Sequence, residues 1–241
     1  EPVLLRGNHL TPAQELVPRS FLKALGPSDL ANRGSGRMDL ARRMIDPGNP
    51  FVSRVAVNRI WHHLFGRGIV ETVDNFGVAG QAPTHPELLD FLASQIMNRG
   101  WSVKNLIRQM VLSQTYRQSS KPNLASAKVD PNNALLHRMP IRRLQAEVIR
   151  DQLLAVSGRI DRQQFGKGPK VHITPFMRSN RSPSGSGPMD GAGRRSIYVE
   201  VRRNHLEPML TAFDKPTPFT TMGRRLVSNS PAQPLIMLNN E

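Results

Sequence analysis

The chain has 241 residues, 38% hydrophobic and 21% charged, which is typical of a folded globular protein and excludes a disordered or purely fibrous one. It contains no cysteine, so disulfides, thiolate nucleophiles, iron–sulfur clusters, cysteine-ligated zinc and covalently attached haem are excluded. The formal net charge is +15, and no apolar stretch is long enough to predict a membrane span.

The first 50 residues predict an extended lead-in, because prolines and a Gly-Ser-Gly stretch interrupt them. One short helix is expected in this segment, from Met38 to Ile45. It should end at Asp46-Pro47-Gly48.

Three helices joined by short turns are predicted next. Apolar residues at three- and four-residue spacing indicate the first, over residues 52–65. Thr84 and Glu87 form a capping-box pattern that predicts the start of the second, which should end at Gly100. Ser102 is expected to cap the third. Together these helices predict a bundle-like core.

The second half of the chain changes character after a predicted fourth helix, from about Arg143 to Ser157. In residues 182–193, nine of twelve positions are Ser, Gly or Pro, which predicts a mobile loop. Residues 196–201 alternate as a half-buried strand should, and residues 171–173 are the expected partner strand.

These elements predict a mainly α protein, with a helical bundle core and a small β element in the C-terminal half. The expected organisation is a lead-in over 1–50, a helical core over 51–158, and an Arg-rich, loop-rich segment over 159–241. We expect the last segment to pack on the core as part of one domain.

Arginine supplies most of the positive charge, with 26 of the 33 basic residues. The excess is +5 up to residue 120 and +10 after it. This pattern fits either a polyanion-binding surface in the second half or structural arginines together with a codon bias. If the surface exists, we expect salt-sensitive binding to anionic polymers. Its predicted cations are Arg159, Arg162, Lys167, Lys170, Arg178 and Arg181.

The first predicted helix of the core has two polar ridges, formed by Asn58 with His62 and by Arg59 with His63. The two histidines are adjacent in sequence and point about 100° apart, and neither belongs to a known zinc motif. Hydrogen-bonded histidines are therefore favoured over a metal site. No metal and no cofactor is expected in this chain.

The fourth predicted helix carries alternating charges, with Arg143, Glu147 and Asp151 at i, i+4 and i+8 and Arg150 beside them. A structural ion network is the favoured interpretation. A ligand site remains possible, as does an acid/base pair of Glu147 and Asp151. The neighbouring guanidiniums would lower both carboxyl pKa values and so weaken the acid.

Many ordered segments of the chain resemble one known family, the planctomycete cytochrome-c-associated domain of unknown function, also called the PSD-one domain. The likeness covers nearly the whole chain. The segments that carry it include Arg54-Val55-Ala56-Val57-Asn58-Arg59-Ile60-Trp61, Phe65-Gly66-Arg67-Gly68, Asp74-Asn75-Phe76-Gly77, Arg142-Arg143-Leu144-Gln145-Ala146-Glu147, Arg194-Arg195-Ser196-Ile197-Tyr198, Arg203-Asn204, Phe213-Asp214, Arg224-Arg225 and Leu238-Asn239-Asn240.

This resemblance implies no established activity, so the catalytic residues are unknown. It implies an exported or periplasmic multidomain protein, whose partners are cytochrome c-like or lectin-like domains of the same polypeptide. It also implies further helices beyond this chain's last residue. The candidate ligand or ion-network residues are Asn58, Arg59, His63, Arg143, Glu147, Arg150, Asp151, Arg203, Asn204, Asp214 and Arg225.

The sequence therefore favours a binding or assembly module that contacts anionic glycans. The alternative is a hydrolase or lyase acting on an anionic polysaccharide, with its acid and base drawn from Glu147, Asp151, His63 and Asp214. A second alternative is non-specific nucleic-acid binding, which the charge favours. The chain has only two Trp and two Tyr residues with which to stack bases.

Overall fold

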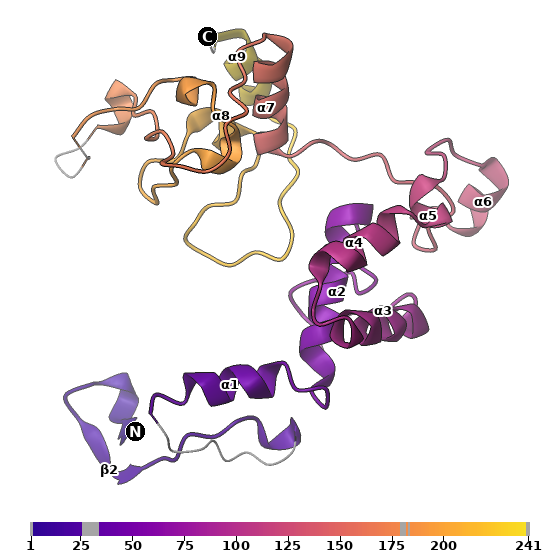
Figure 1. The fold of residues 1–241 in the computed structure, drawn as a ribbon, viewed down its shortest axis with the longest axis vertical. Helices are drawn as coiled ribbons and strands as arrows, with labels where there is room; N and C mark the ends of the chain where they lie inside the picture. Colours follow the sequence, from indigo (N-terminus) through magenta and orange to yellow (C-terminus); the bar gives the residue numbers. More distant parts are fainter. Residues whose placement is uncertain (1, 26–33, 179–181, 183, 240–241) are drawn as a thin grey trace. The chain divides into compact units, whose positions relative to one another are not determined.

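The structure is a computed structural model that describes residues 2–25, 34–178, 182 and 184–239. The chain forms two compact units, residues 1–140 and residues 141–241 (Figure 1). The described residues contain nine α-helices, a single two-stranded sheet and several short 3-10 helices. The predicted fold class, mainly α with a small β element, is confirmed. No helix among these residues is both long and apolar enough to cross a membrane.

The two-stranded sheet lies in the lead-in, which corrects its predicted place in the C-terminal half. Strand β1 (Pro2–Leu4) pairs antiparallel with β2 (Pro12–Leu16), and Pro2 lies opposite Leu16. In the described part of the C-terminal half, β pairing is limited to two isolated bridges, Asp161 with Arg194 and Arg202 with His205.

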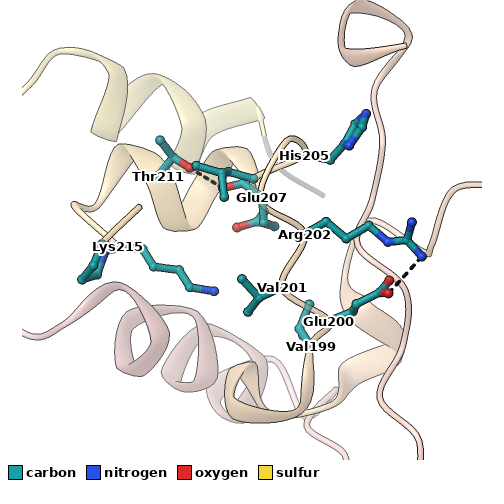
Figure 2. A pocket seen from close by; sticks show the side chains of 10 residues that line it. Val199, Glu200, Val201, Arg202, His205, Glu207, Thr211 and Lys215 are labelled. Carbon is teal, nitrogen blue, oxygen red and sulfur yellow. Dashed lines mark hydrogen bonds and ion pairs between the residues drawn. The ribbon is translucent and has the colours of Figure 1, made fainter. Parts of the chain in front are cut away.

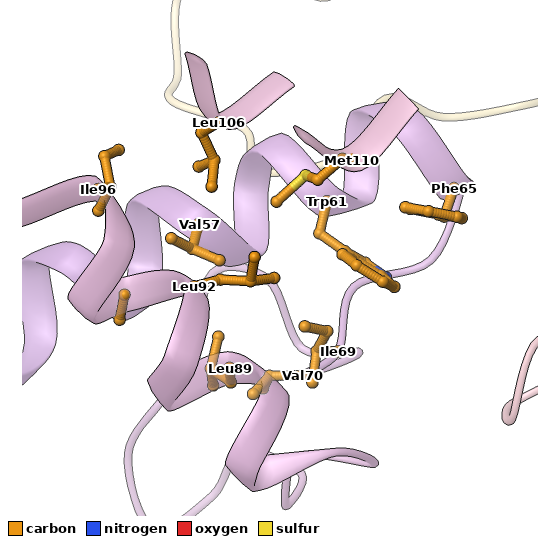
Figure 3. Packing of buried hydrophobic residues seen from close by; sticks show 11 residues of the cluster. Val57, Trp61, Phe65, Ile69, Val70, Leu89, Leu92, Ile96, Leu106 and Met110 are labelled. Atoms are coloured by element: carbon orange, nitrogen blue, oxygen red, sulfur yellow. The ribbon is translucent and has the colours of Figure 1, made fainter. Parts of the chain in front are cut away.

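The unit of residues 1–140 is built around three helices that share one hydrophobic core. Its helices are α1 (Arg37–Met44), α2 (Pro50–Phe65), α3 (Pro86–Asn98), α4 (Val103–Val111), α5 (Gln114–Arg117) and α6 (Leu124–Val129). Figure 3 shows residues of α2, α3 and α4 packed together, with Val57 and Leu92 in contact range at the centre. The rings of Trp61 and Phe65 stack at 4.0 Å between centroids.

Local signals set the ends of these helices, with one exception. Asn49 caps α2 by accepting a hydrogen bond from the N–H of Phe51, and Gly66 ends the helix with a φ of 82°. The predicted cap at Ser102 is confirmed. The predicted capping box at Thr84 is wrong, because the Thr84 hydroxyl donates to the carbonyl of Ile69 instead. Helix α3 begins without a side-chain cap.

The unit of residues 141–241 combines short helices with long irregular segments. Its helices are α7 (Ala146–Val156), α8 (Pro208–Ala212), α9 (Ala232–Asn239) and the 3-10 helices Pro175–Met177, Gly191–Gly193 and Ser196–Tyr198. A small core joins Ala146 of α7 to Met209, Leu210 and Phe213. Helix α7 was predicted within the 51–158 core, and it clusters with residues 141–241. That the whole chain forms one domain stays a prediction.

The strand predicted over residues 196–201 is wrong. Its first half forms the 3-10 helix Ser196–Tyr198, and residues 171–173 form no strand. The reason is that other groups bind this backbone: the N–H of Ser196 donates to Asp151, and the N–H of Glu200 donates to the carbonyl of Pro169. The alternation did not report burial either, because Ile197 and Val201 are exposed and only Val199 of the three apolar residues is buried.

The Ser/Gly/Pro stretch was predicted to be mobile, but its second half has defined partners. Gly187 donates to the carbonyl of Val171, and Gly191 and Gly193 are buried. A Cβ atom on Gly187 would lie 1.9 Å from the carbonyl oxygen of Lys170, so glycine permits this close approach. This second half is held by backbone hydrogen bonds and close packing, which its low hydrophobicity does not reveal.

Candidate functional site

The most distinctive feature of the 141–241 unit is a set of arginine and carboxylate side chains around α7. Arg225 donates to the carboxylate of Glu147, and both side chains are partly buried. Arg143 donates to the carboxylate of Asp214 and to the carbonyl of Ser228. We call Arg143, Glu147, Arg150, Asp151, Arg195, Asp214 and Arg225 the arginine–carboxylate network.

Arg150 is the most buried member of this network, with a relative exposure of 6%. Its guanidinium donates to the carbonyl of Arg194 at 2.9 Å and to the hydroxyl of Ser196 at 3.0 Å. It also donates to the carbonyl of Asp190. Arg150 therefore fastens the 190–196 segment to α7.

Asp151 binds the same segment from the neighbouring position on α7. One carboxylate oxygen accepts from the N–H of Ser196 at 2.7 Å, and the other accepts from Arg195 at 3.2 Å. The predicted i, i+4 ladder along the helix does not form, because Arg143 precedes α7 and Glu147 pairs with Arg225. The network instead joins α7 to residues far away in the sequence.

The surroundings of Glu147 and Asp214 lower the pKa values of these two carboxyls. Burial is the largest single influence and would raise the pKa of Glu147. The hydrogen bond from Arg225, a backbone hydrogen bond and the charges of Arg225 and Lys215 together outweigh it and hold this pKa below its usual value. Burial would also raise the pKa of Asp214, and hydrogen bonds from Ser228 and Arg143 reverse that effect. Both groups are therefore charged at neutral pH, where a general acid would need to keep its proton.

The lowered pKa values predict that acid destabilises the chain. A carboxyl whose pKa is lower in the folded state stabilises the fold above its unfolded pKa of about 4, and this contribution is lost as the pH falls through the folded value. We expect the free energy of unfolding, measured with urea, to decrease between pH 6 and pH 3. Glu147→Gln should flatten this dependence, whereas Glu87→Gln on α3 should not. Equal pH profiles for both variants would contradict the prediction.

A small pocket beside the network contains Lys215, which the sequence analysis did not single out (Figure 2). Figure 2 shows its side chain extending into the pocket, with Val201 and Glu207 beside it. Among the described residues, its ammonium group has no hydrogen-bond or ion-pair partner. Burial, partly offset by the charges of Glu147 and Glu207, lowers the pKa of Lys215.

The Lys215 pocket is too small for a substrate. Its volume is about 10 Å³, which is room for roughly one water molecule. Glu207 is also occupied, since its carboxylate accepts from the N–H groups of Met209 and Leu210. Only the rarity of lysine in this Arg-rich chain could have drawn attention to this position, because its burial depends on contacts distant in sequence.

The candidate residues on α2 lie in the 1–140 unit, and each has different contacts. Asn58 is fully buried and exchanges two hydrogen bonds of 2.9 Å with the backbone of Val70. Arg59 is exposed and lies 3.7 Å from Asp74. His63 is exposed, and its ring contacts that of His62 edge-on. Within the residues the structure places, no group of three or more His, Asp or Glu side chains is arranged to hold a metal ion.

Arg203 and Asn204 lie outside the arginine–carboxylate network. Both are exposed and line an open groove of about 630 Å³ together with Phe219. The structure thus divides the eleven predicted candidates: six belong to the network, two line this groove, and three lie on α2.

Fold and site together define a mainly α protein in which arginines bind several carboxylates of the 141–241 unit. A family model described as PSD1, protein of unknown function (DUF1553), matches residues 36–241. The chain belongs to this family. Comparison with curated proteins and with solved structures finds no match.

Proposed function

We propose that this chain is a non-catalytic binding module whose 141–241 unit attaches to anionic polymers. The supporting observation is how the charges of this unit are distributed. Each of its described carboxylates accepts a hydrogen bond or ion pair from an arginine or from a backbone N–H group. These carboxylates are Glu147, Asp151, Asp161, Asp190, Glu200, Glu207 and Asp214.

Other basic side chains of this unit take no part in these ion pairs. Six exposed basic side chains of this unit have no ion-pair partner among the described residues, so their charge faces solvent. They are Arg162, Lys167, Lys170, Arg178, Arg203 and Arg224. Of the cluster predicted from sequence, Arg159 instead pairs with Asp190, and Arg181 lies outside the described residues.

An anionic glycan is the polymer we propose, within a larger exported protein that also carries cytochrome c-like or lectin-like domains. This setting rests on the family resemblance, whereas the exposed cations support only the attraction to polyanions. Non-specific nucleic-acid binding would use the same cations and remains the alternative for the binding test.

The hydrolase or lyase alternative has less support. Its proposed acids, Glu147 and Asp214, have lowered pKa values and bound arginines. One observation favours hydrolysis by another route: the hydroxyl of Ser182 lies 3.0 Å from Nε2 of His205. Among the described residues no carboxylate orients this imidazole, as a complete triad would require. Labelling of Ser182 by a fluorophosphonate, absent in Ser182→Ala, would support that route.

The polyanion proposal predicts salt-sensitive retention on heparin. We expect the triple variant Lys167→Gln, Lys170→Gln, Arg178→Gln to elute at lower salt. The slope of log affinity against log salt should fall by up to about three, since each lost contact releases fewer counterions. The measurement is retention across a salt series, with the same variants tested on an uncharged glycan.

A charge-matched control comes from the other unit. Lys104, Arg108 and Arg117 are exposed, and replacing all three by glutamine gives the same change in net charge. This control should leave the salt slope nearly unchanged. If it lowers retention as much as the first triple variant does, total charge and not the 141–241 surface is responsible, and the proposal fails.

A further inference from the structure

A second groove of the 141–241 unit has the size and chemistry of a ligand site. It lies beside α7 and has a volume of about 480 Å³, within the range typical of small-molecule sites. Residues of α7 and of the segments 160–164 and 195–198 line it. We call it the α7 groove. Unlike the Lys215 pocket, it is large enough for a sugar unit.

Three of its polar side chains are free to bind a ligand. Gln152, Arg162 and Gln164 are exposed and make no side-chain hydrogen bond to any described residue. Each amide offers both donors and an acceptor, which suits hydroxyl groups that also donate and accept. The guanidinium offers a planar fork for a carboxylate or a sulfate.

The rest of the groove is fixed before any ligand binds. Asp151 and Arg195 are held by each other, and Asp151 also accepts from the backbone of Ser196. Such a preformed floor limits the entropic cost of binding to the ordering of the three exposed side chains, Gln152, Arg162 and Gln164.

Tyr198 supplies a rigid apolar surface in the groove. The guanidinium of Arg194 lies 4.7 Å from its ring centroid. The N–H of Tyr198 donates to the carbonyl of Arg195 at 2.9 Å, which holds the backbone that carries the ring. A tyrosine ring held in this way offers contact area at little entropic cost. Val148 and Ile160 extend the apolar lining.

We propose that the α7 groove binds a single acidic sugar unit of a glycan chain. Arg162 pairs with the acidic group, Gln152 and Gln164 bind hydroxyls, and the apolar side of the sugar lies against Tyr198. The proposal deepens the proposed function and rests on it. A polynucleotide suits the groove less well, because the residues that line it include one aromatic side chain, Tyr198, on which to stack a base.

Calorimetry of the full chain with defined oligosaccharides tests this proposal. The probes are tetragalacturonate, a sulfated tetrasaccharide and neutral maltotetraose, so that carboxylate and sulfate recognition are distinguished. We expect Arg162→Gln to weaken binding of the preferred acidic probe about tenfold or more, as expected for a lost charge-assisted hydrogen bond. The double variant Gln152→Ala, Gln164→Ala should also weaken it about tenfold.

The control is Arg108→Gln, which removes an exposed arginine of the 1–140 unit that neither lines the groove nor belongs to the proposed cation surface. It should change affinity less than twofold. Thermal unfolding of all variants should coincide with that of the parent chain, because none of the replaced side chains has a hydrogen-bond or ion-pair partner among the residues that the structure describes.

Several outcomes would overturn the proposal, and they differ from failure of the proposed function. If neutral maltotetraose bound as tightly as the acidic probes, the acidic group would have no part in recognition. Tighter binding of a short DNA oligonucleotide, with the same sensitivity to Arg162→Gln, would make the groove a nucleic-acid site. Retention on heparin without any effect of the groove variants would overturn the groove alone. If the parent chain is not retained on heparin, or if its retention does not depend on salt, the proposed function itself is overturned.

Discussion

Arg150→Ala is expected to lower the free energy of unfolding by about 3–5 kcal/mol, the range for removing one partner of a buried charged cluster. Arg150 is buried, and its guanidinium binds the carbonyls of Arg194 and Asp190 and the hydroxyl of Ser196. Alanine would remove the guanidinium donor from the Arg194 carbonyl and the Ser196 hydroxyl, leave the Asp190 carbonyl only the N–H of Gly193, and open space between α7 and the 190–196 segment. Urea denaturation at pH 7 measures the change.

Two further variants make this expectation specific. Arg224→Ala removes an exposed arginine and should change stability by no more than about 0.5 kcal/mol. Gly191→Ala should destabilise, because a Cβ atom there would lie 2.5 Å from Nη2 of Arg150, and the φ of Gly191 is +59°. If Arg150→Ala cost no more than Arg224→Ala, the guanidinium would not be what fastens the segment.

The helices of the first unit could be predicted because their signals are local. Apolar spacing in 52–65 anticipated α2, whose observed bounds are Pro50–Phe65, and Ser102 caps α4 as predicted. The predictions failed where a group distant in sequence forms the hydrogen bond instead. Thr84 had the right spacing for a capping box, but Ile69 offered its hydroxyl another acceptor.

The candidate site could be predicted only in part, for the same reason. The charges on α7 were recognised from their spacing, but their partners Arg195, Asp214 and Arg225 lie far along the chain. Sequence spacing shows which side chains share a helix face, and it does not show what that face meets. Lys215 was missed altogether, since its only distinction is a location created by tertiary contacts.

The arginine bias of the chain acquires a double explanation from these pairings. Part of the arginine is structural, as the burial of Arg150 and the pairing of Arg143 and Arg225 show. Because these residues neutralise the carboxylates, the remaining exposed cations have no local counter-charge. Structural arginines and a positive surface are thus not alternatives, because pairing the carboxylates with some arginines leaves the others as net positive charge on the surface.

Asn58→Ala on α2 should lower the free energy of unfolding by about 2–5 kcal/mol. Asn58 is fully buried, and its amide satisfies both the N–H and the carbonyl of Val70. Alanine would leave two buried backbone groups without partners, each costing about 1–3 kcal/mol. The fit is close: a Cβ atom on Gly68 would lie 2.9 Å from either amide atom of Asn58.

The neighbouring residue supplies the control for this prediction. Arg59→Ala removes an exposed side chain whose contact with Asp74 is 3.7 Å long, and it should cost no more than about 1 kcal/mol. Urea denaturation measures both variants, and hydrogen exchange at the Val70 amide should accelerate only in Asn58→Ala. Similar small costs for the two would mean that Asn58 is not required by the fold, and its sequence-based assignment as a ligand residue would then regain its force. A large cost confined to Asn58→Ala, with no loss of retention on heparin, would assign this residue to the core of the 1–140 unit.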